Sequence, residues 1–313
     1  MSVTHREEQR GERLLDVVTD EEAGLRLIIS RLGAELVSLA RRNRAGEWIG
    51  FLHRDNDLNA PAQGWANHAT VMGYFLHRLK EGESLYRGQK ISGGTHSFLR
   101  AKTWSLARPK EQEASVTYQI TPADFSPAEY PLPVGLQLTY AIVKEAVMAQ
   151  FHFTNHEREL PAHVGFGLHP GFAASSFESF VLHMPAGKYR RHLSPANYLS
   201  GETEEIDFGG GAMPFPRAEL PGSCILEMVA VPRREFVFID KPSGREVTLD
   251  LTGVPYVTLW SDGGPFLCVE PCWGLTDHHV QRAFEDKEGI QLIPPGGELT
   301  AQCALTPRLT TPQ

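Results

Sequence analysis

The feature that most constrains this chain is the recurrence of short segments in which apolar and polar residues alternate. Alternation with a period of two buries one face of a β-strand and leaves the other in solvent. These segments are rich in Val, Phe, Thr and Tyr, and turn-forming residues separate them. They are ASVTYQIT, LQLTYAIV, VMAQFHFTNH, FESFVLHM, REFVFID, REVTLDL, VTLWSD and ELTAQCALT. With 29 glycines and 22 prolines, the pattern predicts an all-β fold, a large antiparallel sandwich or barrel.

The organisation of the chain favours one domain over residues 1–313, because no Pro/Gly/Ser linker and no fixed-period repeat divides it. The first dozen residues, MSVTHREEQRGE, are polar, and we expect residues 1–12 to be frayed. Residues 193–223 are predicted to form the longest irregular region. A functional loop and a plain surface excursion are both open interpretations of that region.

The composition of the chain limits the classes of partner that it is expected to have. The formal net charge of −8 argues against a nucleic-acid partner, and the absence of a run of 18 apolar residues argues against a membrane span. Four cysteines, without an opening signal peptide, indicate a reducing, cytoplasmic setting. Cys268 and Cys272 have no matching His or Cys pair at metal-ligand spacing, so no zinc site is expected.

Several polar residues lie in apolar or glycine-rich surroundings. Glu270 follows a continuous apolar strand in FLCVEPCWG, where a carboxylate is either paired or kept as a base. His169 lies in VGFGLHPGF, whose glycines suggest close approach to the backbone, although a core histidine is the other interpretation. His96 lies in GGTHSFLR, and strand spacing would place His96, Phe98 and Arg100 on one face.

These residues, with Arg78 in MGYFLHRLKEG, make up two histidines, one glutamate and two arginines. Arg78 by itself is most simply a solvated side chain. Together they are what a site that moves protons on a polyhydroxylated substrate needs. A G-x-S-x-G elbow and a phosphate-binding glycine loop are both absent from the sequence, which argues against serine hydrolysis and nucleotide chemistry.

The order of the motifs resembles the aldose 1-epimerase (galactose mutarotase) superfamily over nearly the whole chain. HSFLR resembles the family's His-Gly-Phe-x-Arg, and CVEP resembles its glutamate-bearing strand near the C-terminus. The motifs in order are LGAEL, MGYFLHRL, GTHSFLRAKTW, FTNHERELPAHVGFGLHPGF, IDKPSGREVTL, LWSDGGPFLCVEPCWG and IQLIPPGGEL. The resemblance implies a β-sandwich of the supersandwich kind with an open sugar-binding cleft, an isomerase activity, and neither a cofactor nor a metal.

The resemblance also implies roles for the candidate residues. His169 would be the acid that protonates the ring oxygen of a pyranose. Glu270 would be the base that takes the proton of the anomeric hydroxyl, and His96 would be a donor to the same oxygen as His169. Arg78 and Arg100 would bind substrate oxygens. Ring opening and closure on the other face would then interconvert the α and β anomers of a hexose or related sugar.

The sequence departs from the family at several positions. Ser97 replaces the family's glycine, His77 replaces its asparagine, and the Asp-His pair of galactose-type members is missing before SGREVTL. Galactose specificity is therefore not expected, and a sugar phosphate stays open because two arginines are able to hold a phosphate. Trp273, just past Glu270, is either a stacking platform for a sugar or a rim aromatic.

Other functions and assemblies also stay open. A non-catalytic sugar-binding or sugar-sensing protein would keep the cleft without turnover, although it would need no acid opposite a base. A lyase on the same sandwich would favour a Tyr or Lys base, which we do not find. Exposed edge strands make a homodimer plausible.

Overall fold

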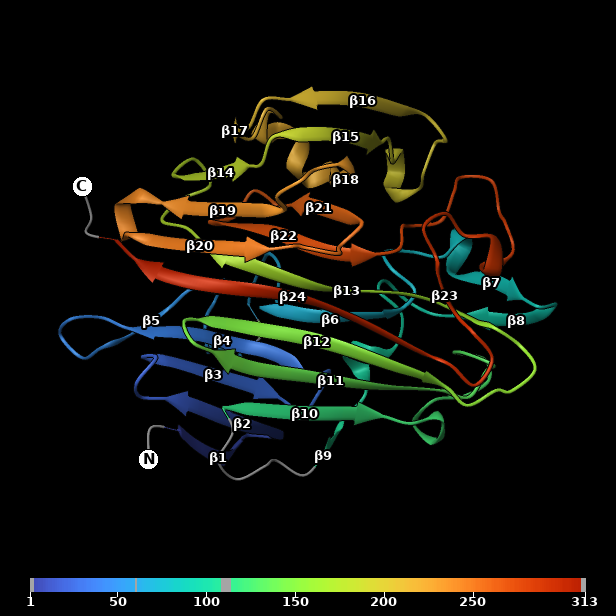
Figure 1. Cartoon of the computed structure of the whole chain (residues 1–313), viewed down its shortest axis with the longest axis horizontal. Coiled ribbons are helices and arrows are strands. Elements are labelled where there is room, and N and C mark those ends of the chain that lie inside the picture. Colours follow the sequence, from blue (N-terminus) through green and yellow to red (C-terminus); the bar gives the residue numbers. More distant parts are fainter. Residues whose placement is uncertain (1–2, 60, 108–113, 311–313) are drawn as a thin grey trace.

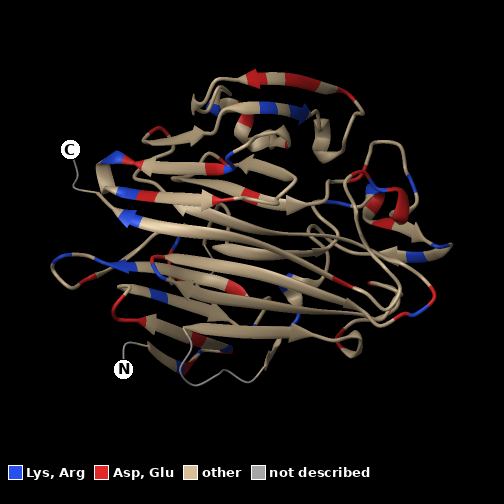
Figure 2. Cartoon of the chain, in the orientation of Figure 1, with Lys and Arg blue, Asp and Glu red and all other residues tan. Residues whose placement is uncertain are grey.

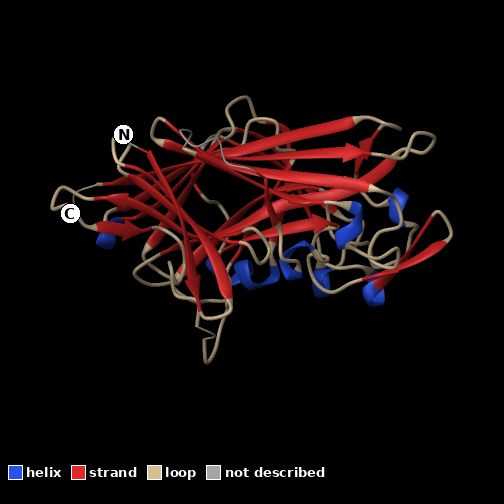
Figure 3. Cartoon of the chain, turned by 90° about the horizontal axis from the view of Figure 1, so that it is seen from below, coloured by secondary structure: helices blue, strands red, loops and turns tan. Residues whose placement is uncertain are grey.

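The computed structural model describes residues 3–59, 61–107 and 114–310. Antiparallel strands form the layers of the molecule, and short 3₁₀ helices lie outside these layers (Figures 1 and 3). The helices are η1 (Lys80–Gly82), η2 (Leu99–Ala101), η3 (Pro122–Asp124), η4 (Pro195–Asn197), η5 (Arg217–Gly222), η6 (Lys241–Ser243) and η7 (Phe284–Asp286). None of these described helices has the length and apolar character to cross a bilayer. The predicted all-β, antiparallel sandwich is confirmed.

The largest sheet has nine strands and contains seven of the eight segments that the alternation predicted. Buried and solvent-facing residues alternate along its central strands, because only one face of this sheet meets the core. In sheet order the strands are β17 (Gly211–Ala212), β14 (Phe180–Met184), β19 (Glu235–Asp240), β20 (Arg245–Asp250), β24 (Glu298–Leu309), β12 (Ala146–Asn155), β11 (Val134–Val143), β10 (Ser115–Ile120) and β9 (Ser105–Ala107).

The second large sheet is covered on both faces at its centre. Every residue of β6 and β22 is buried, so these strands have no alternation and appear in the sequence as continuous apolar runs. In order the strands are β16 (Thr203–Phe208), β15 (Gly187–His192), β18 (Cys224–Ala230), β21 (Tyr256–Trp260), β22 (Phe266–Trp273), β13 (Ala162–Ala173) and β23 (Gln291–Ile293), and β6 (Ala69–Tyr74) also pairs with β13.

Aromatic side chains join the two large sheets. Phe151 and Phe153 of β12 contact Phe166 of β13, with ring centroids 5.1 and 4.6 Å apart. Trp273 of β22 stacks on Phe166 at 5.0 Å with an interplanar angle of 10°. Trp273 is therefore part of the core between the sheets. Because successive side chains of a strand point to opposite faces, Glu270, three residues earlier, points away from that core.

The N-terminal strands form a separate five-stranded sheet, and a small hairpin lies beyond it in the chain. The strands are β1 (Val3–Arg10), β2 (Arg13–Asp20), β3 (Leu25–Ser30), β4 (Glu35–Arg42) and β5 (Trp48–Gly50), and the hairpin is β7 (Glu83–Tyr86) with β8 (Gln89–Ser92). The expectation that residues 1–12 are frayed is wrong for β1, which pairs with β2 along its whole length. Residues 1 and 2 lie outside the described residues. A polar sequence suits an edge strand, because backbone hydrogen bonds hold it and its charges discourage further pairing.

Residues 193–223 are also more regular than predicted. They contain η4, β16, β17 and η5, and β16 pairs with β15. Figure 2 shows basic residues on β15 facing acidic residues on β16. Arg190 forms an ion pair with Glu205 across these strands at 2.6 Å. The polar composition that suggested a loop is the composition of a charged edge strand.

Asp16 on β2 connects the N-terminal sheet to the nine-stranded sheet. Its fully buried carboxylate accepts hydrogen bonds from Nε of Arg31 at 2.9 Å and from the hydroxyl of Tyr118, on β10, at 2.8 Å. Burial by itself would raise the pKa of Asp16, but hydrogen bonds from Arg31, His5 and Tyr118 outweigh it and hold that pKa well below its ordinary value. The contact therefore stabilises the fold only while Asp16 is ionised.

We predict that Asp16→Asn lowers the free energy of unfolding at pH 7 by about 3 kcal/mol, because Arg31 loses its buried partner. A carboxyl group with a depressed folded-state pKa contributes stability above its unfolded pKa, and this contribution is lost as the pH falls. The difference between variant and wild type should therefore shrink below about pH 4. Urea unfolding from pH 7 to pH 3 measures it. Asp207→Asn, on the exposed face of β16, is the matched control, and equal effects of the two substitutions would contradict the prediction.

Candidate active site

Strand register brings the two principal candidates together. The antiparallel pairing of β13 with β22 places Gly171 opposite Cys268. The same register places His169, two residues before Gly171, opposite Glu270, two residues after Cys268. Nε2 of His169 is 3.2 Å from Oε1 of the Glu270 carboxyl group. Thr70 of β6 lies opposite His169 on its other side. The strands β6, β13 and β22 thus present a row of polar side chains on the face of the sheet that points away from the core.

Both side chains of this pair are buried. Glu270 is 1% exposed, and its Oε2 has no hydrogen-bond partner among the described residues. Burial raises the pKa of Glu270 well above its ordinary value. Burial also lowers the pKa of His169 to about 3, with a smaller contribution from His77. Because burial disfavours both charges, the pair holds one proton, and the favoured state has Glu270 protonated and His169 neutral.

Trp65 covers one side of the His169 ring. The two rings stack with centroids 4.9 Å apart. A side chain at Gly171 would lie 2.5 Å from the Trp65 ring, and one at Gly167 would lie 2.5 Å from the carbonyl oxygen of Pro271. The atoms that approach the backbone at these two glycines of VGFGLHPGF are therefore atoms of the protein itself. The glycines allow Trp65 and β22 to pack closely around His169.

His96 lies in a tight turn, so the expected strand face shared with Phe98 and Arg100 is wrong. His96 and Ser97 have φ of 64° and 63°, and η2 begins two residues later. The turn is held reciprocally: the His96 N–H donates to the carbonyl of His77 at 2.7 Å, and the His77 N–H donates to Nδ1 of His96 at 3.2 Å. Since Nδ1 is the acceptor, the ring proton of neutral His96 is on Nε2. Positive φ is uncommon for residues other than glycine, and these two hydrogen bonds support the turn in that conformation.

The ring of His96 lies close to the central pair. Its centroid is 5.3 Å from that of His169, and the two rings are nearly perpendicular. Burial, together with His169 and His77, lowers the pKa of His96 well below its ordinary value. Burial likewise lowers the pKa of His77 to about 4. All three histidines are therefore neutral near pH 7 in the unliganded site.

A pocket of about 320 Å³ opens over these residues. Five of the six predicted site residues line it: His96, His169, Glu270, Arg78 and Arg100. The sixth, Trp273, does not, because it belongs to the core between the sheets. The sequence interpretation missed other lining residues, which include Trp65, Trp260, Asn67, Thr70, Asn197 and Ser223. Asn197 and Ser223 show that the 193–223 segment does reach the site.

The aromatic wall of the pocket is formed by Trp65 and Trp260. Their rings meet edge to face at 5.8 Å, and Trp260 also meets His169 edge to face at 5.7 Å. Trp260 lies in a strand that alternation had identified, VTLWSD, but Trp65 lies in a loop without periodicity. Periodicity in the sequence could therefore have pointed to Trp260 but not to Trp65. An indole face beside His169 and Glu270 is a stacking surface of the kind that one of the two interpretations gave to Trp273.

The polar rim of the pocket is basic. Arg78 and Arg100 are exposed, and neither forms an ion pair with a residue in the part of the chain that the structure describes. Glu270 is the one acidic residue among those that line the pocket. The two guanidinium groups are thus available to bind oxygen atoms of a ligand.

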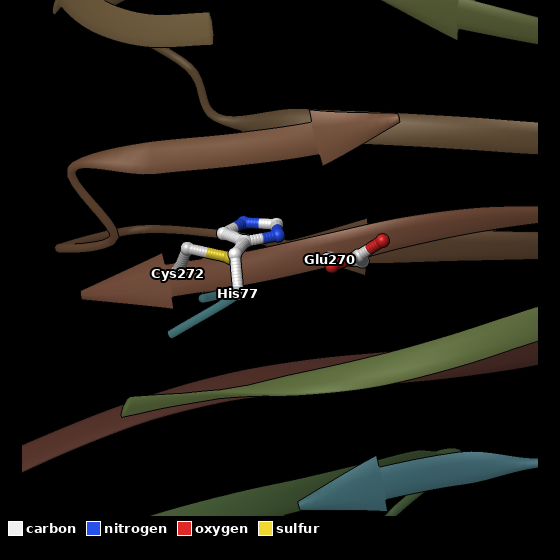
Figure 4. A group of neighbouring side chains, drawn as sticks. All are labelled: His77, Glu270 and Cys272. Atoms are coloured by element: carbon white, nitrogen blue, oxygen red, sulfur yellow. The ribbon is translucent and has the colours of Figure 1, made fainter. Parts of the chain in front are cut away.

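Two groups of side chains have the ligand types of a metal site. In the first, a ligand atom from each of His77, Glu270 and Cys272 lies within 4.8 Å of the others (Figure 4). In the second, His169 and Cys268 take part with Glu270. Spacing along the chain did not predict either group, since the histidines come from segments distant from β22.

The sequence pattern of the aldose 1-epimerase family matches residues 16–306. The chain belongs to this family. Among curated proteins, the plasmid form of Protein LacX from Lactococcus lactis subsp. lactis is 23% identical over 257 residues, which cover 75% of this chain and 84% of that protein. The resemblance to the aldose 1-epimerase family seen in the sequence motifs is confirmed.

Solved structures of the family have the same fold. A galactose mutarotase related enzyme from Lactobacillus acidophilus superposes with a TM-score of 0.81 at 21% identity and covers 98% of both chains. A galactose mutarotase-like protein from Lactobacillus casei has a TM-score of 0.79 at 18% identity, over 97% of this chain and 100% of its own. Family and fold together support a sugar-related, mutarotase-like function with a small-molecule sugar as ligand.

We predict opposite effects for the two tryptophans. Trp273→Ala should lower the free energy of unfolding by about 3–5 kcal/mol, because it empties a large core position. Trp260→Ala should change stability less and weaken sugar binding at the pocket wall. Urea unfolding and calorimetric titration with sugar separate the effects, and Trp273→Phe serves if the alanine variant does not fold. A loss of sugar affinity in a stable Trp273 variant would contradict the prediction and show that Trp273 contributes to sugar binding.

Proposed function

We propose that this aldose 1-epimerase family member is a mutarotase that interconverts the α and β anomers of a hexose or related sugar. One observation carries the proposal: a buried histidine and a buried glutamate lie 3.2 Å apart at the floor of the pocket. A buried carboxyl group is costly to maintain unless it has a task or a full set of partners. Glu270 does not have a full set of hydrogen-bond partners, since its Oε2 has none among the described residues.

The reaction needs an acid and a base side by side. The ring oxygen and the anomeric hydroxyl oxygen are bonded to the same carbon, so each catalytic group must come within about 3 Å of its own oxygen from neighbouring positions. His169 and Glu270 lie on adjacent strands with Nε2 and Oε1 3.2 Å apart, which supports their assignment as this acid and base. In the reacting complex the single proton of the pair lies on His169 and Glu270 is ionised. His169 gives this proton to the ring oxygen while Glu270 takes the hydroxyl proton, the ring C–O bond breaks, and an aldehyde forms.

Closure reverses the two transfers after rotation about the C1–C2 bond. Ring opening leaves Glu270 protonated and His169 neutral, which is the distribution that burial favours. In closure, His169 takes the proton of the ring hydroxyl and Glu270 returns a proton to the carbonyl oxygen. The pair holds one proton in total before and after each half-reaction, so turnover requires no exchange of protons with solvent.

His96 and the arginines complete the proposed site. With its Nδ1 occupied by the His77 N–H, His96 has its Nε2–H free to donate to the ring oxygen. Arg78 and Arg100 would bind other oxygens of the sugar. Their free guanidinium groups keep a phosphorylated sugar among the substrates to be tested.

The first test is the decay of optical rotation of freshly dissolved α-D-glucose, α-D-galactose and glucose 6-phosphate. We expect the wild type, at substoichiometric concentration, to accelerate the decay for at least one of them. Positioned acids and bases contribute roughly 10²–10⁴-fold each, so His169→Asn and Glu270→Gln should each lower the rate by at least about a hundredfold. Circular dichroism checks that both variants fold.

The alternative function is sugar binding or sensing without turnover. It predicts that a sugar binds by calorimetry while none in a broad panel relaxes faster than in buffer. That result would replace the mutarotase by a sugar-binding relative. Normal rates in both folded variants would leave a mutarotase with a different acid and base.

The pH dependence provides an independent test. The working pair holds one proton, so kcat/KM should fall on the acid side as a second proton adds to His169, whose pKa is about 3. On the alkaline side it should fall when Glu270, whose pKa burial raises, loses the last proton. We therefore expect no loss of activity on the acid side near pH 6.5, the ordinary pKa of histidine. A rate profile with the buffer rate subtracted measures it, and an acid-side inflection near that value would contradict the buried one-proton pair.

A further inference from the structure

The strand that carries Glu270 also carries a thiol on the same face. Cys272 follows Glu270 by two residues on β22, and strand geometry directs both side chains to one side of the sheet. His77 comes from the turn that holds His96, and its ring lies over β22 between the two side chains (Figure 4). One ligand atom from each of the three residues lies within 4.8 Å of the others.

Two of these groups have no hydrogen-bond partner. The ring Nε2 of His77 and Oε2 of Glu270 are buried, and neither finds a partner in the part of the chain that the structure describes. Buried polar atoms in native proteins are nearly always satisfied by protein, water or an ion. A nitrogen and a carboxylate oxygen that remain open beside a thiol are a donor set for a metal.

We propose that His77, Glu270 and Cys272 bind Zn²⁺ or a cation of similar softness. Imidazole nitrogen, carboxylate oxygen and thiolate sulfur are the ligands that zinc takes in proteins, usually in tetrahedral geometry. Three protein ligands leave the fourth position for water or a substrate oxygen. Binding needs the thiolate of Cys272 and the carboxylate of Glu270. The thiol proton is therefore released to solvent, and the proton of the central pair moves from Glu270 to His169.

The neighbouring group of His169, Cys268 and Glu270 is the weaker candidate. Nε2 of His169 is already hydrogen-bonded to Glu270 at 3.2 Å, so a metal there would have to break the central pair. All three of its residues are buried. His77, in contrast, is partly exposed and lines the pocket, which gives a cation a path to its site.

Zinc at this position would inhibit the proposed reaction. Glu270 cannot accept the proton of the anomeric hydroxyl while its carboxylate is a metal ligand. The inhibitory part of the inference rests on the proposed function, but the binding part does not. The site would make the enzyme sensitive to free zinc through the same carboxyl group that catalysis uses.

The test of binding uses Co²⁺ as a spectroscopic probe, followed by displacement with Zn²⁺. Ligation by Cys272 predicts one equivalent of Co²⁺ with a sulfur-to-cobalt charge-transfer band in the near ultraviolet, which Zn²⁺ abolishes. Cys272→Ser should lose this band and bind Zn²⁺ at least about tenfold more weakly. Cys268→Ser is the matched control, because it removes a buried thiol from the same face of β22, two residues on the other side of Glu270. It should keep both the band and the affinity.

The outcomes distinguish metal binding from inhibition of the proposed reaction. Loss of the band in Cys268→Ser with its retention in Cys272→Ser would move the metal to the other group and overturn the assignment. Absence of the charge-transfer band in the folded wild type would overturn the site altogether. For inhibition, Zn²⁺ should stop the wild type while Cys272→Ser, with unchanged basal turnover, stays active. Equal inhibition of both proteins would show that zinc acts elsewhere, and a wild type without any turnover would leave the spectroscopic test of binding intact.

Discussion

The contact between His169 and Glu270 is the interaction on which the rest of the site depends. A histidine and a carboxyl group 3.2 Å apart would be an ordinary ion pair in water. Here burial opposes both charges, so the pair keeps one proton and the favoured unliganded state has Glu270 protonated and His169 neutral. The burial of the pair requires a sheet whose two faces are both covered by other side chains. The core aromatics cover one face, and Trp65 covers His169 on the other.

The turn that carries His96 shows how a strained backbone is maintained. His77 and His96 both have positive φ, and two hydrogen bonds join them: the His96 N–H donates to the carbonyl of His77, and the His77 N–H donates to the His96 ring. The second of these hydrogen bonds selects the tautomer of His96. It also brings His77 over β22, beside Glu270 and Cys272 (Figure 4). One small structure thus supplies a proton donor to the proposed reaction and the nitrogen ligand of the proposed zinc site.

Sequence alternation identified the outer sheet far better than the sheet that bears the site. β11 and β12 alternate because one of their faces meets solvent, whereas β6 and β22 are buried on both faces and carry no such signal. Trp273 could have been excluded by the same rule, since an odd separation from Glu270 in one strand places it on the other face. Trp65 had no local signal. Its role follows from the space that Gly171 leaves on a strand about a hundred residues later.

The sequence by itself determined the all-β class, most strand positions, the family, and the polar residues whose apolar surroundings marked Glu270 and His169. These properties depend on local composition, on a period of two and on motif order. Only the tertiary structure decided that Trp273 is in the core, that His96 is in a turn, that β1 is paired, and that His77 lies beside Cys272. Each of these depends on which strands pair, in which register, and on what covers their faces. Such contacts join residues far apart in the chain, and local periodicity does not encode them.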